Sequence, residues 1–504
     1  MTIKIKKITS WKRAEELTIL PVFKQGKSFV AHAAWSEIVK ELPGVAAYLA
    51  RHAFTGVCKE SILIPCGLHN GTSTSVVLVG LGERNAFTTD NMRLAMASAR
   101  KRAKDAKVTS VACLLPEKLV AEDGSAVDLW QAACEGWMLA GYTFHTYKGK
   151  RENTPAEEQG VQEATWYVTA AQLTQAEKGC ELGRVTAEAT ATARDLVNTP
   201  SMDMTPVHML AAAQAVAKGR VSLKSLDVDA MRELGMYAAL AVGMGSDHKP
   251  VGAHFIYKPS GASKKRIVLI GKAVTFDSGG LSIKPADGMM TMKIDMAGAA
   301  TVIGVFQALA SMQVNAEVHG VFLAVENMPS GGAYRPGDVV KAMNGKTIEV
   351  LNTDAEGRVT LADALSYATT LEPDVVIDLA TLTGACVVAL GEEVAGIMGN
   401  DKRLMEKLTR EGERTGEPLW ELPLFAGYED HIKSKIADVK NIGSRGQAGT
   451  ISAALFLQHF IGKYAWAHLD IAGPSYAEKE SRSDTPYGGT GFGVRLLLRY
   501  LQSF

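Results

Sequence analysis

Two carboxylates, Asp354 and Glu356, stand two residues apart in the segment 352–359, which reads Asn-Thr-Asp-Ala-Glu-Gly-Arg-Val. The β-branched residues before this segment predict a strand over 347–351, and the residues after it predict a helix that starts at 360. Ligands bind at such strand-to-helix turns in open α/β sheets. In an extended segment, residues two apart point to the same side, so the two carboxylates are expected to converge. Because converging carboxylates repel each other, they favour a bound cation, and a divalent metal is the natural candidate.

Two more segments place charged residues beside predicted strand or helix ends. The first follows a predicted buried strand and contains Lys272, Asp277 and Lys284. The second contains Asp295, at the start of a helix of small residues predicted over 297–312. An aspartate at that position can cap the helix or bind a metal.

Together these segments supply four carboxylates, which is more than one metal ion needs. Two ions about 3.5–4 Å apart, bridged by carboxylates, would use all four. Oxygen ligands without clustered His or Cys suit Mg²⁺, Mn²⁺ or a carboxylate-rich Zn²⁺ site. Such a pair generates a hydroxide nucleophile near neutral pH, and Lys284 and Arg358 remain to stabilise a developing oxyanion. Lys272 could ligate a metal only as the free amine, so burial and nearby cations would have to lower its pKa.

Alternating strands and helices predict two α/β domains around these segments. Residues 1–171 are expected to form a smaller N-terminal α/β domain, because strands and helices alternate along it. Residues 172–194 are rich in helix formers and predict a connecting helix, which stops before Pro200. Residues 195–504 are expected to form a larger catalytic α/β domain with a central mixed, mostly parallel sheet flanked by helices.

Composition limits the classes of function. The formal net charge is zero, which argues against a generic nucleic-acid or membrane binder, and no apolar stretch reaches the length of a membrane span. The six cysteines are scattered without a CxxC pair, and the polar segment 11–16 stands where a secretory signal would have its apolar run. We therefore expect a cytoplasmic protein with free thiols. Neither HExxH nor GxSxG occurs, which argues against a mononuclear zincin and a serine-hydrolase elbow.

The segment 352–358 resembles the signature of the leucyl aminopeptidase family, the dizinc enzymes also called cytosol aminopeptidase or aminopeptidase A. Four further segments resemble that family in order and spacing, namely 274–280, 295–300, 378–385 and 491–496. The resemblance covers essentially all of 195–504 and is weaker over 1–171, since the family's first domain is variable. One departure is Ala273, where the family usually has glycine after the metal-binding lysine.

The resemblance implies a role for each metal-ligating residue. Asp277 and Glu356 would bridge two divalent ions, Zn²⁺ or Mn²⁺. Asp354 would complete the site of one ion through its side chain and its main-chain oxygen. Lys272 and Asp295 would complete the site of the other.

The resemblance also implies the groups that act on the substrate. Lys284 would polarise the scissile carbonyl and stabilise the tetrahedral intermediate. Arg358 would hold a bicarbonate ion that acts as general base, with help from the backbone near Leu382. The residues expected to line the pocket for the first side chain are Met292, Thr381 and Gly384.

The activity implied is that of a hydrolase, a metal-dependent exopeptidase. It would release the N-terminal amino acid of peptides, preferably leucine or another apolar residue, by metal-activated water attack. The family also implies a homo-oligomer, a hexamer, in the cytoplasm.

Two alternatives from other classes stay open at this point. Some bacterial members of the family also bind DNA, and a local basic cluster on a predicted helix at 91–107 would suit a DNA-binding accessory role. The cluster consists of Arg100, Lys101, Arg102, Lys104 and Lys107. The other alternative is a dinuclear hydrolase of a different substrate, such as a phosphoester.

Overall fold

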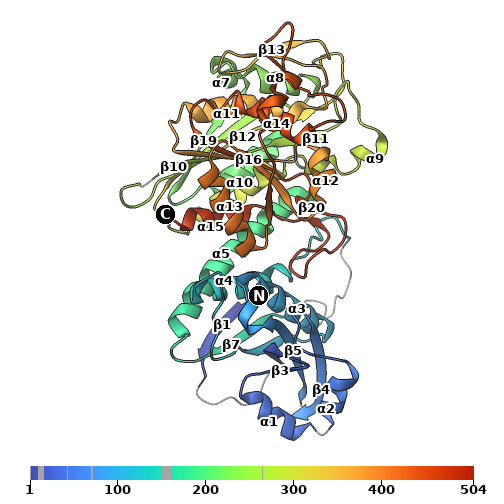
Figure 1. Cartoon of the computed structure of the whole chain (residues 1–504), viewed down its shortest axis with the longest axis vertical. Coiled ribbons are helices and arrows are strands. Elements are labelled where there is room, and N and C mark those ends of the chain that lie inside the picture. Colours follow the sequence, from blue (N-terminus) through green and yellow to red (C-terminus); the bar gives the residue numbers. More distant parts are fainter. Residues whose placement is uncertain (1, 9–15, 43, 70–71, 150–159, 264) are drawn as a thin grey trace. The chain divides into compact units, whose positions relative to one another are not determined.

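The computed structural model in Figure 1 describes residues 2–8, 16–42, 44–69, 72–149, 160–263 and 265–504. Most of the segment 11–16, which argued against a secretory signal, lies outside these residues. The chain divides into two compact units. Unit 1 comprises Met1–Ala187 and Glu480–Pro486, and unit 2 comprises Glu188–Lys479 and Tyr487–Phe504. The long helix α5 (Leu173–Asn198) crosses the division between them.

Unit 1 is an α/β unit built on a seven-stranded sheet of order β1-β7-β6-β2-β5-β4, with β3 paired to β2. Its strands are β1 (Thr2–Lys7), β2 (Leu17–Gln25), β3 (Ser28–Val30), β4 (Ser61–His69), β5 (Thr72–Glu83), β6 (Ser110–Leu114) and β7 (Glu163–Val168). Its helices are α1 (Ala34–Glu41), α2 (Val45–Arg51), α3 (Thr89–Asp105) and α4 (Ala126–Leu139). The core under α3 and α4 contains large side chains such as Trp137 and Trp166, both fully buried.

The central strand β2 was missed by sequence reasoning, although most of its residues are buried. Pro21 in its middle has no N–H to donate, which argues against an interior strand. The structure resolves the conflict, because β2 pairs with β6 only at 17–19. Pro21 therefore lies beyond the β2–β6 ladder. It is paired on one side only, with β5, where it lies opposite Val79.

The segment Glu480–Pro486 belongs to unit 1, where partly buried ion pairs hold it. Arg482 pairs with Asp90 at 2.7 Å and with Asp484 at 3.1 Å, and Asp484 is fully buried. Arg93 extends the network from Asp90 to the buried Glu135. Asp90 and Arg482 are 392 residues apart in the sequence, so no local pattern could have predicted the pair.

Three residues of the basic cluster, all on α3, make contacts within unit 1. The Arg100 guanidinium lies 5.2 Å from the ring centre of Trp137, and burial lowers its pKa to about 10. Lys101 pairs with Glu480, and Arg102 donates to the Ser61 hydroxyl at 3.1 Å. Because Arg100, Lys101 and Arg102 make these contacts, they do not form a free cationic face. The DNA-binding alternative finds no support.

Unit 2 is built on a nine-stranded sheet of order β17-β16-β19-β15-β10-β12-β9-β8, with β11 paired to β12. Its strands are β8 (Val221–Leu226), β9 (Val251–Tyr257), β10 (Arg266–Gly271), β11 (Ala273–Asp277), β12 (Glu317–Asn327), β15 (Val375–Ala380), β16 (Ala395–Gly399), β17 (Leu419–Glu421) and β19 (Ala465–Asp470). Smaller sheets contain β13 (Val339–Lys341), β14 (Thr347–Glu349) and β18 (Val439–Lys440), and β20 (Tyr476–Ala477) with β21 (Gly488–Gly489). The helices are α6 (Pro206–Val216), α7 (Val228–Glu233), α8 (Tyr237–Val242), α9 (Ala286–Met289), α10 (Ala297–Leu309), α11 (Glu356–Thr369), α12 (Gly384–Leu390), α13 (Lys402–Thr415), α14 (Gly449–Gln458) and α15 (Val494–Gln502).

The sheet of unit 2 is mixed and mostly parallel, which confirms the predicted fold class. Strands β12, β10, β15 and β19 run parallel as neighbours. Strand β9 pairs with β12, and β16 with β19, in the antiparallel sense. Helices cover both faces of the sheet, with α11 and α14 on one side and α10, α13 and α15 on the other (Figure 1). In β10, Val268 and Ile270 join the core under α11, so Ile267 and Leu269 point toward α10.

One helical stretch of the described residues, Ala286–Leu309, is long and apolar enough to cross a membrane. Its helix α10 is a core element, since nearly all of its side chains are buried against β10, β12 and α15. A buried core helix passes the same length and composition test, so this stretch is weak evidence for a membrane span.

Candidate metal centre

A pocket of about 250 Å³ opens in unit 2 where β10, β11 and β15 end. All eleven residues nominated from the sequence line it, together with Ile294, Val387 and Ala472. The eleven are Lys272, Asp277, Lys284, Met292, Asp295, Asp354, Glu356, Arg358, Thr381, Leu382 and Gly384. The carboxyl ends of parallel strands share one edge of the sheet, which is why segments far apart in sequence meet here.

Lys272 reaches the centre of the pocket from the end of β10. Its ammonium lies 2.6 Å from Asp295 Oδ1 and 2.8 Å from Glu356 Oε1, and it donates to the carbonyl of Thr381 at 2.9 Å. The side chain passes close to the first turn of α11 at Gly357. A Cβ atom at that position would lie 2.4 Å from Lys272 Cε, so only glycine leaves room.

Asp295 contributes a carboxylate to the pocket and does not cap α10. The N-cap residue of that helix is Met296, and no side chain caps it. Instead, Asp295 Oδ1 accepts from Lys272 and, at 2.7 Å, from the hydroxyl of Thr381. Its Oδ2 is buried and has no hydrogen-bond partner among the described residues. Of the two roles that its position predicted, the helix cap is therefore wrong.

Asp277 closes β11 and faces a second lysine. Its Oδ1 accepts from the Gly279 N–H at 2.9 Å and from the Asn327 side-chain amide at 2.8 Å. Its Oδ2 lies 2.9 Å from Lys284 Nζ, which also lies 2.5 Å from Asp354 Oδ1. Lys284 thus bridges two of the four carboxylates.

Asp354 and Glu356 converge, but not through an extended backbone. Helix α11 begins at Glu356 rather than at 360, and Asp354 lies in the turn before it. The extended geometry expected from the sequence is therefore wrong. A glutamate in the first helical turn is favoured by the helix dipole, which compensates for the poor helix propensity of Gly357. The carboxylates of Asp277, Asp354 and Glu356 still offer oxygens within 4.8 Å of one another.

The charge balance of the cluster suits bound cations. Four carboxylates face two ammonium groups in direct contact, which leaves two negative charges uncompensated within the cluster. Glu356 Oε2 and Asp295 Oδ2 are both buried without a hydrogen-bond partner among the described residues. Buried carboxylate oxygens without partners are costly unless they bind a cation. The oxygen-rich donor set therefore fits divalent metal ions.

The pKa values of the carboxyls reflect their crowding. Burial raises the pKa of Asp277, and the neighbouring Glu356 charge raises it further. Burial alone would lower the pKa of Lys272, but Asp295, Glu356 and Asp277 outweigh it and raise that pKa. A free amine at Lys272 would thus need additional positive charge among these carboxylates.

Arg358 lies at the back of the pocket and is suited to an anion. Burial lowers the pKa of its guanidinium to about 10, so it stays charged at neutral pH. Its Nε is buried and unpartnered within the described part of the chain. The backbone N–H of Leu382 donates to Asp470 Oδ1 at 3.2 Å. Asp470 also accepts from the Thr383 hydroxyl at 2.6 Å and so fixes the loop after β15.

Sequence reasoning missed the residues that hold the ligands in place, chiefly Asn327, Tyr334 and Asp470. Tyr334 donates its hydroxyl hydrogen to the Thr353 carbonyl at 2.9 Å, and Asn327 donates to the same oxygen at 2.9 Å. Asp470 ends β19, a strand whose residues are nearly all buried. A charge within a buried strand was the available signal for Asp470, whereas nothing local marked the other two.

One wall of the pocket is apolar and open. Met292, Ile294, Val387 and Ala472 contribute to its lining. Gly384 begins α12, and a Cβ atom placed there would meet nothing within 4 Å. The wall therefore has room for a substrate side chain beside the carboxylate cluster.

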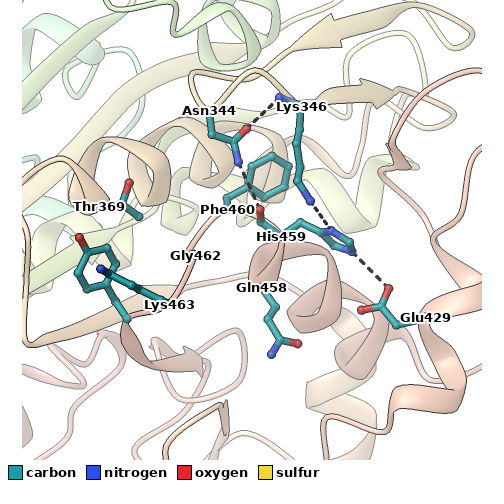
Figure 2. A pocket seen from close by; sticks show the side chains of 10 residues that line it. Asn344, Lys346, Thr369, Glu429, Gln458, His459, Phe460, Gly462 and Lys463 are labelled. Atoms are coloured by element: carbon teal, nitrogen blue, oxygen red, sulfur yellow. Dashed lines mark hydrogen bonds and ion pairs between the residues drawn. The ribbon is translucent and has the colours of Figure 1, made fainter.

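A roomier cavity of about 680 Å³ opens elsewhere on unit 2, but it lacks such a cluster (Figure 2). Its centre is His459, hydrogen-bonded to Lys346 at 2.9 Å and to Glu429 at 3.3 Å. The cavity includes Thr369, the last residue of α11, whose first residue is Glu356. At 1.5 Å per residue, this helix of 14 residues separates the two sites by about 20 Å.

Fold and pocket together define a two-domain α/β protein with a carboxylate-rich metal-binding centre at the carboxyl ends of its strands. Comparison with known proteins makes the assignment specific. Residues 191–498 match the catalytic domain of the cytosol aminopeptidase family, and residues 19–151 match its N-terminal domain. The chain therefore belongs to the cytosol aminopeptidase family, which confirms the predicted resemblance.

Individual relatives agree with this assignment. A probable cytosol aminopeptidase of Aquifex aeolicus is 45% identical over 435 residues, covering 86% of this chain and 85% of the relative. One from Geobacter sulfurreducens is 45% identical over 429 residues, covering 85% of each. A solved structure of the bottromycin maturation enzyme BotP in complex with Mn matches with a TM-score of 0.83 and 32% identity, covering 97% of this chain and 99% of that one. The protein is thus a metal-dependent aminopeptidase, a hydrolase of the exopeptidase class.

Proposed function

We propose that the pocket holds two divalent ions and releases the N-terminal residue, leucine or another apolar amino acid, from peptides. The observation that supports this most strongly is the cluster of four carboxylates with the unpartnered buried oxygens of Asp295 and Glu356. Zn²⁺ and Mn²⁺ both suit such ligands, and the related BotP was solved with Mn.

The ligands divide into two sets. Following the family resemblance, Asp277 and Glu356 would contribute to both ions; Glu356 contacts Lys272 and Asp277 contacts Lys284. Asp354 belongs with Lys284 on one side, and Lys272 with Asp295 on the other. When bound, the ions would lower the pKa of water and polarise the scissile carbonyl.

Lys284 is the residue proposed to stabilise negative charge on the substrate carbonyl oxygen. Burial lowers its pKa, but Asp277 and Asp354 raise it by more, so the side chain stays an ammonium at neutral pH. An ammonium group in the pocket lining can donate to a developing oxyanion once metal ions take over the carboxylates that it now contacts.

Arg358 is proposed to bind a bicarbonate ion that accepts the proton of water. Its buried, unpartnered Nε supports an anion at this position. The Leu382 N–H is already bonded to Asp470 at 3.2 Å, so the guanidinium would provide the main contact. A bound bicarbonate would serve as general base beside the carboxylate cluster.

The side chain of the N-terminal residue is proposed to enter the apolar wall. Met292, Thr381 and Gly384 line this part of the pocket, with Ile294 and Val387 beside them. Apolar surface next to a charged cluster favours an apolar side chain at the residue whose amino group faces the carboxylates.

Hydrolysis of leucine p-nitroanilide tests the proposal. Protein stripped of metal by chelation is expected to lose activity and to regain it when Zn²⁺ or Mn²⁺ is added. Buffer without added metal should not restore activity. The Glu356→Gln variant should stay inactive after reloading. Full activity in the stripped protein, or in that variant, would contradict the proposal.

We further propose that the functional division of the chain is 1–171, 172–194 and 195–504, with the last segment catalytic. The separate family matches over 19–151 and 191–498 support this division. The family resemblance also supports a cytoplasmic homo-hexamer, and none of the six cysteines, all of which the structure describes, forms a disulfide. Light scattering would give the mass of the assembly as a multiple of 53.8 kDa.

A further inference from the structure

Asn327 joins two of the segments that supply metal ligands. It is the last residue of β12 and is fully buried. Its side-chain nitrogen donates to Asp277 Oδ1 at 2.8 Å and to the Thr353 carbonyl at 2.9 Å. The first partner is a proposed bridging ligand, and the second immediately precedes Asp354.

The orientation of the Asn327 amide follows from its partners. A carboxylate and a backbone carbonyl are both acceptors, so only the NH₂ group can satisfy them. A flipped amide would place its oxygen against two acceptors at hydrogen-bond distance. The Asn327 oxygen is buried and accepts no hydrogen bond from the described residues. The side chain therefore acts here through its two donors.

These donors fix the direction of the Asp277 carboxylate. Its Oδ1 is held by Asn327 and by the Gly279 N–H, which leaves Oδ2 to face Lys284 in the pocket. Ligating carboxylates that are held in this way bind metal more tightly than free ones.

The same amide fixes the peptide bond before Asp354. The Thr353 carbonyl accepts from Asn327 and from the Tyr334 hydroxyl, both at 2.9 Å. Removing Tyr334 as a donor would still leave this carbonyl with Asn327. Removing Asn327 would take one of two donors from Asp277 Oδ1, leaving the Gly279 N–H, and one of two donors from the Thr353 carbonyl, leaving Tyr334.

We infer that Asn327 is the positioning residue that aligns Asp277 with Asp354 for metal binding. The inference rests on the proposed function, because it needs the cluster to hold metal. Asn327 is not a catalytic residue, since it acts through the two carboxylates. The ion on the Asp354 side depends on both contacts, whereas the ion on the Lys272 and Asp295 side depends only on Asp277.

The test is a calorimetric titration of Mn²⁺ into metal-stripped protein. It compares the wild type with the variants Asn327→Ala and Asn327→Leu. Leucine keeps the side-chain volume while removing both donors, so it separates hydrogen bonding from packing. In both variants the Mn²⁺ affinity of one of the two binding steps should fall by about 10–100-fold, and that of the other step by less. Tyr334→Phe is the matched control and should change both steps far less.

A spectroscopic measurement accompanies the titration. The visible absorption of Co²⁺-loaded protein reports ligand geometry and should change in both Asn327 variants and far less in Tyr334→Phe. Equal Mn²⁺ affinity in wild type and Asn327→Leu would overturn the inference. A wild type that binds no Mn²⁺ would instead overturn the proposed function, so the two failures are distinguishable.

Discussion

At the scale of single residues, we expect Gly384 to set the width of the apolar wall. A Cβ atom there meets nothing within 4 Å, so a larger side chain fits the fold and extends into the pocket. Gly384→Val should therefore fold normally and reject leucine in favour of alanine at the substrate N-terminus. Because one or two methylene groups are worth about 1–3 kcal/mol, the leucine-to-alanine ratio of kcat/KM should fall at least about tenfold. An unchanged ratio would place the substrate side chain elsewhere.

Residues with a chemical role were more predictable than residues that support them. Asp277, Asp295, Asp354 and Glu356 were found from charge at strand and helix ends. Asn327 was not, since one amide after a strand has no distinguishing pattern. Its importance comes from partners 50 and 26 residues away.

At the scale of elements, Asp363 attaches α11 to its neighbours. Its carboxylate accepts from the Ala239 N–H in the first turn of α8 and from the Met343 N–H, both at 2.8 Å. Asp363→Asn would turn one acceptor into a donor that faces an N–H. The free energy of unfolding should fall by about 1–3 kcal/mol, measured by urea denaturation.

The difference between Asp363→Asn and wild type should depend on pH. Burial raises the Asp363 pKa from 3.8 to about 7, against the opposing backbone hydrogen bonds. The folded wild type therefore binds this proton more tightly than the unfolded chain, and loses that stabilisation as pH rises from about 4 to 7. The variant lacks the group, so the stability gap should be widest near pH 4 and narrow toward pH 7. A gap that widens with pH would contradict this sign.

Elements were predicted well where periodicity was strong and poorly where a functional group altered the backbone. The buried strand before Lys272 and the small-residue helix after Asp295 were found from apolar pattern. The start of α11 was placed at 360, from the helix formers that follow that residue, which is four residues too late. In the structure the helix starts at Glu356, and Gly357 lies in its first turn. The glycine leaves space there for the side chain of Lys272.

At the scale of the whole molecule, metal binding should stabilise the fold. The cluster joins residues at the ends of β10 and β11, at the start of α11 and in the turn two residues before α10, so bound ions would favour the folded state over the unfolded chain. Mn²⁺ at about 100 times its dissociation constant should add about 2.7 kcal/mol per independent site to the free energy of unfolding. Thermal unfolding with and without Mn²⁺ measures this, with Glu356→Gln as the control. An equal shift in that variant would place the ions outside the pocket.

The two-domain architecture was predictable from alternating strands and helices, but its exact partition was not. The segment Glu480–Pro486 belongs to unit 1 through contacts such as the Arg482–Asp90 and Lys101–Glu480 ion pairs. Such contacts between distant residues leave no local trace in the sequence. The overlap of α5 with both units likewise follows from packing rather than composition.

The most direct test of the central claim is the number of Mn²⁺ ions bound per chain, measured by mass spectrometry of metal content after dialysis. The account predicts two ions in the wild type and a loss of bound metal in Glu356→Gln, together with loss of leucine p-nitroanilide hydrolysis. Wild type and Glu356→Gln with the same metal content, or an active wild type without metal, would contradict it.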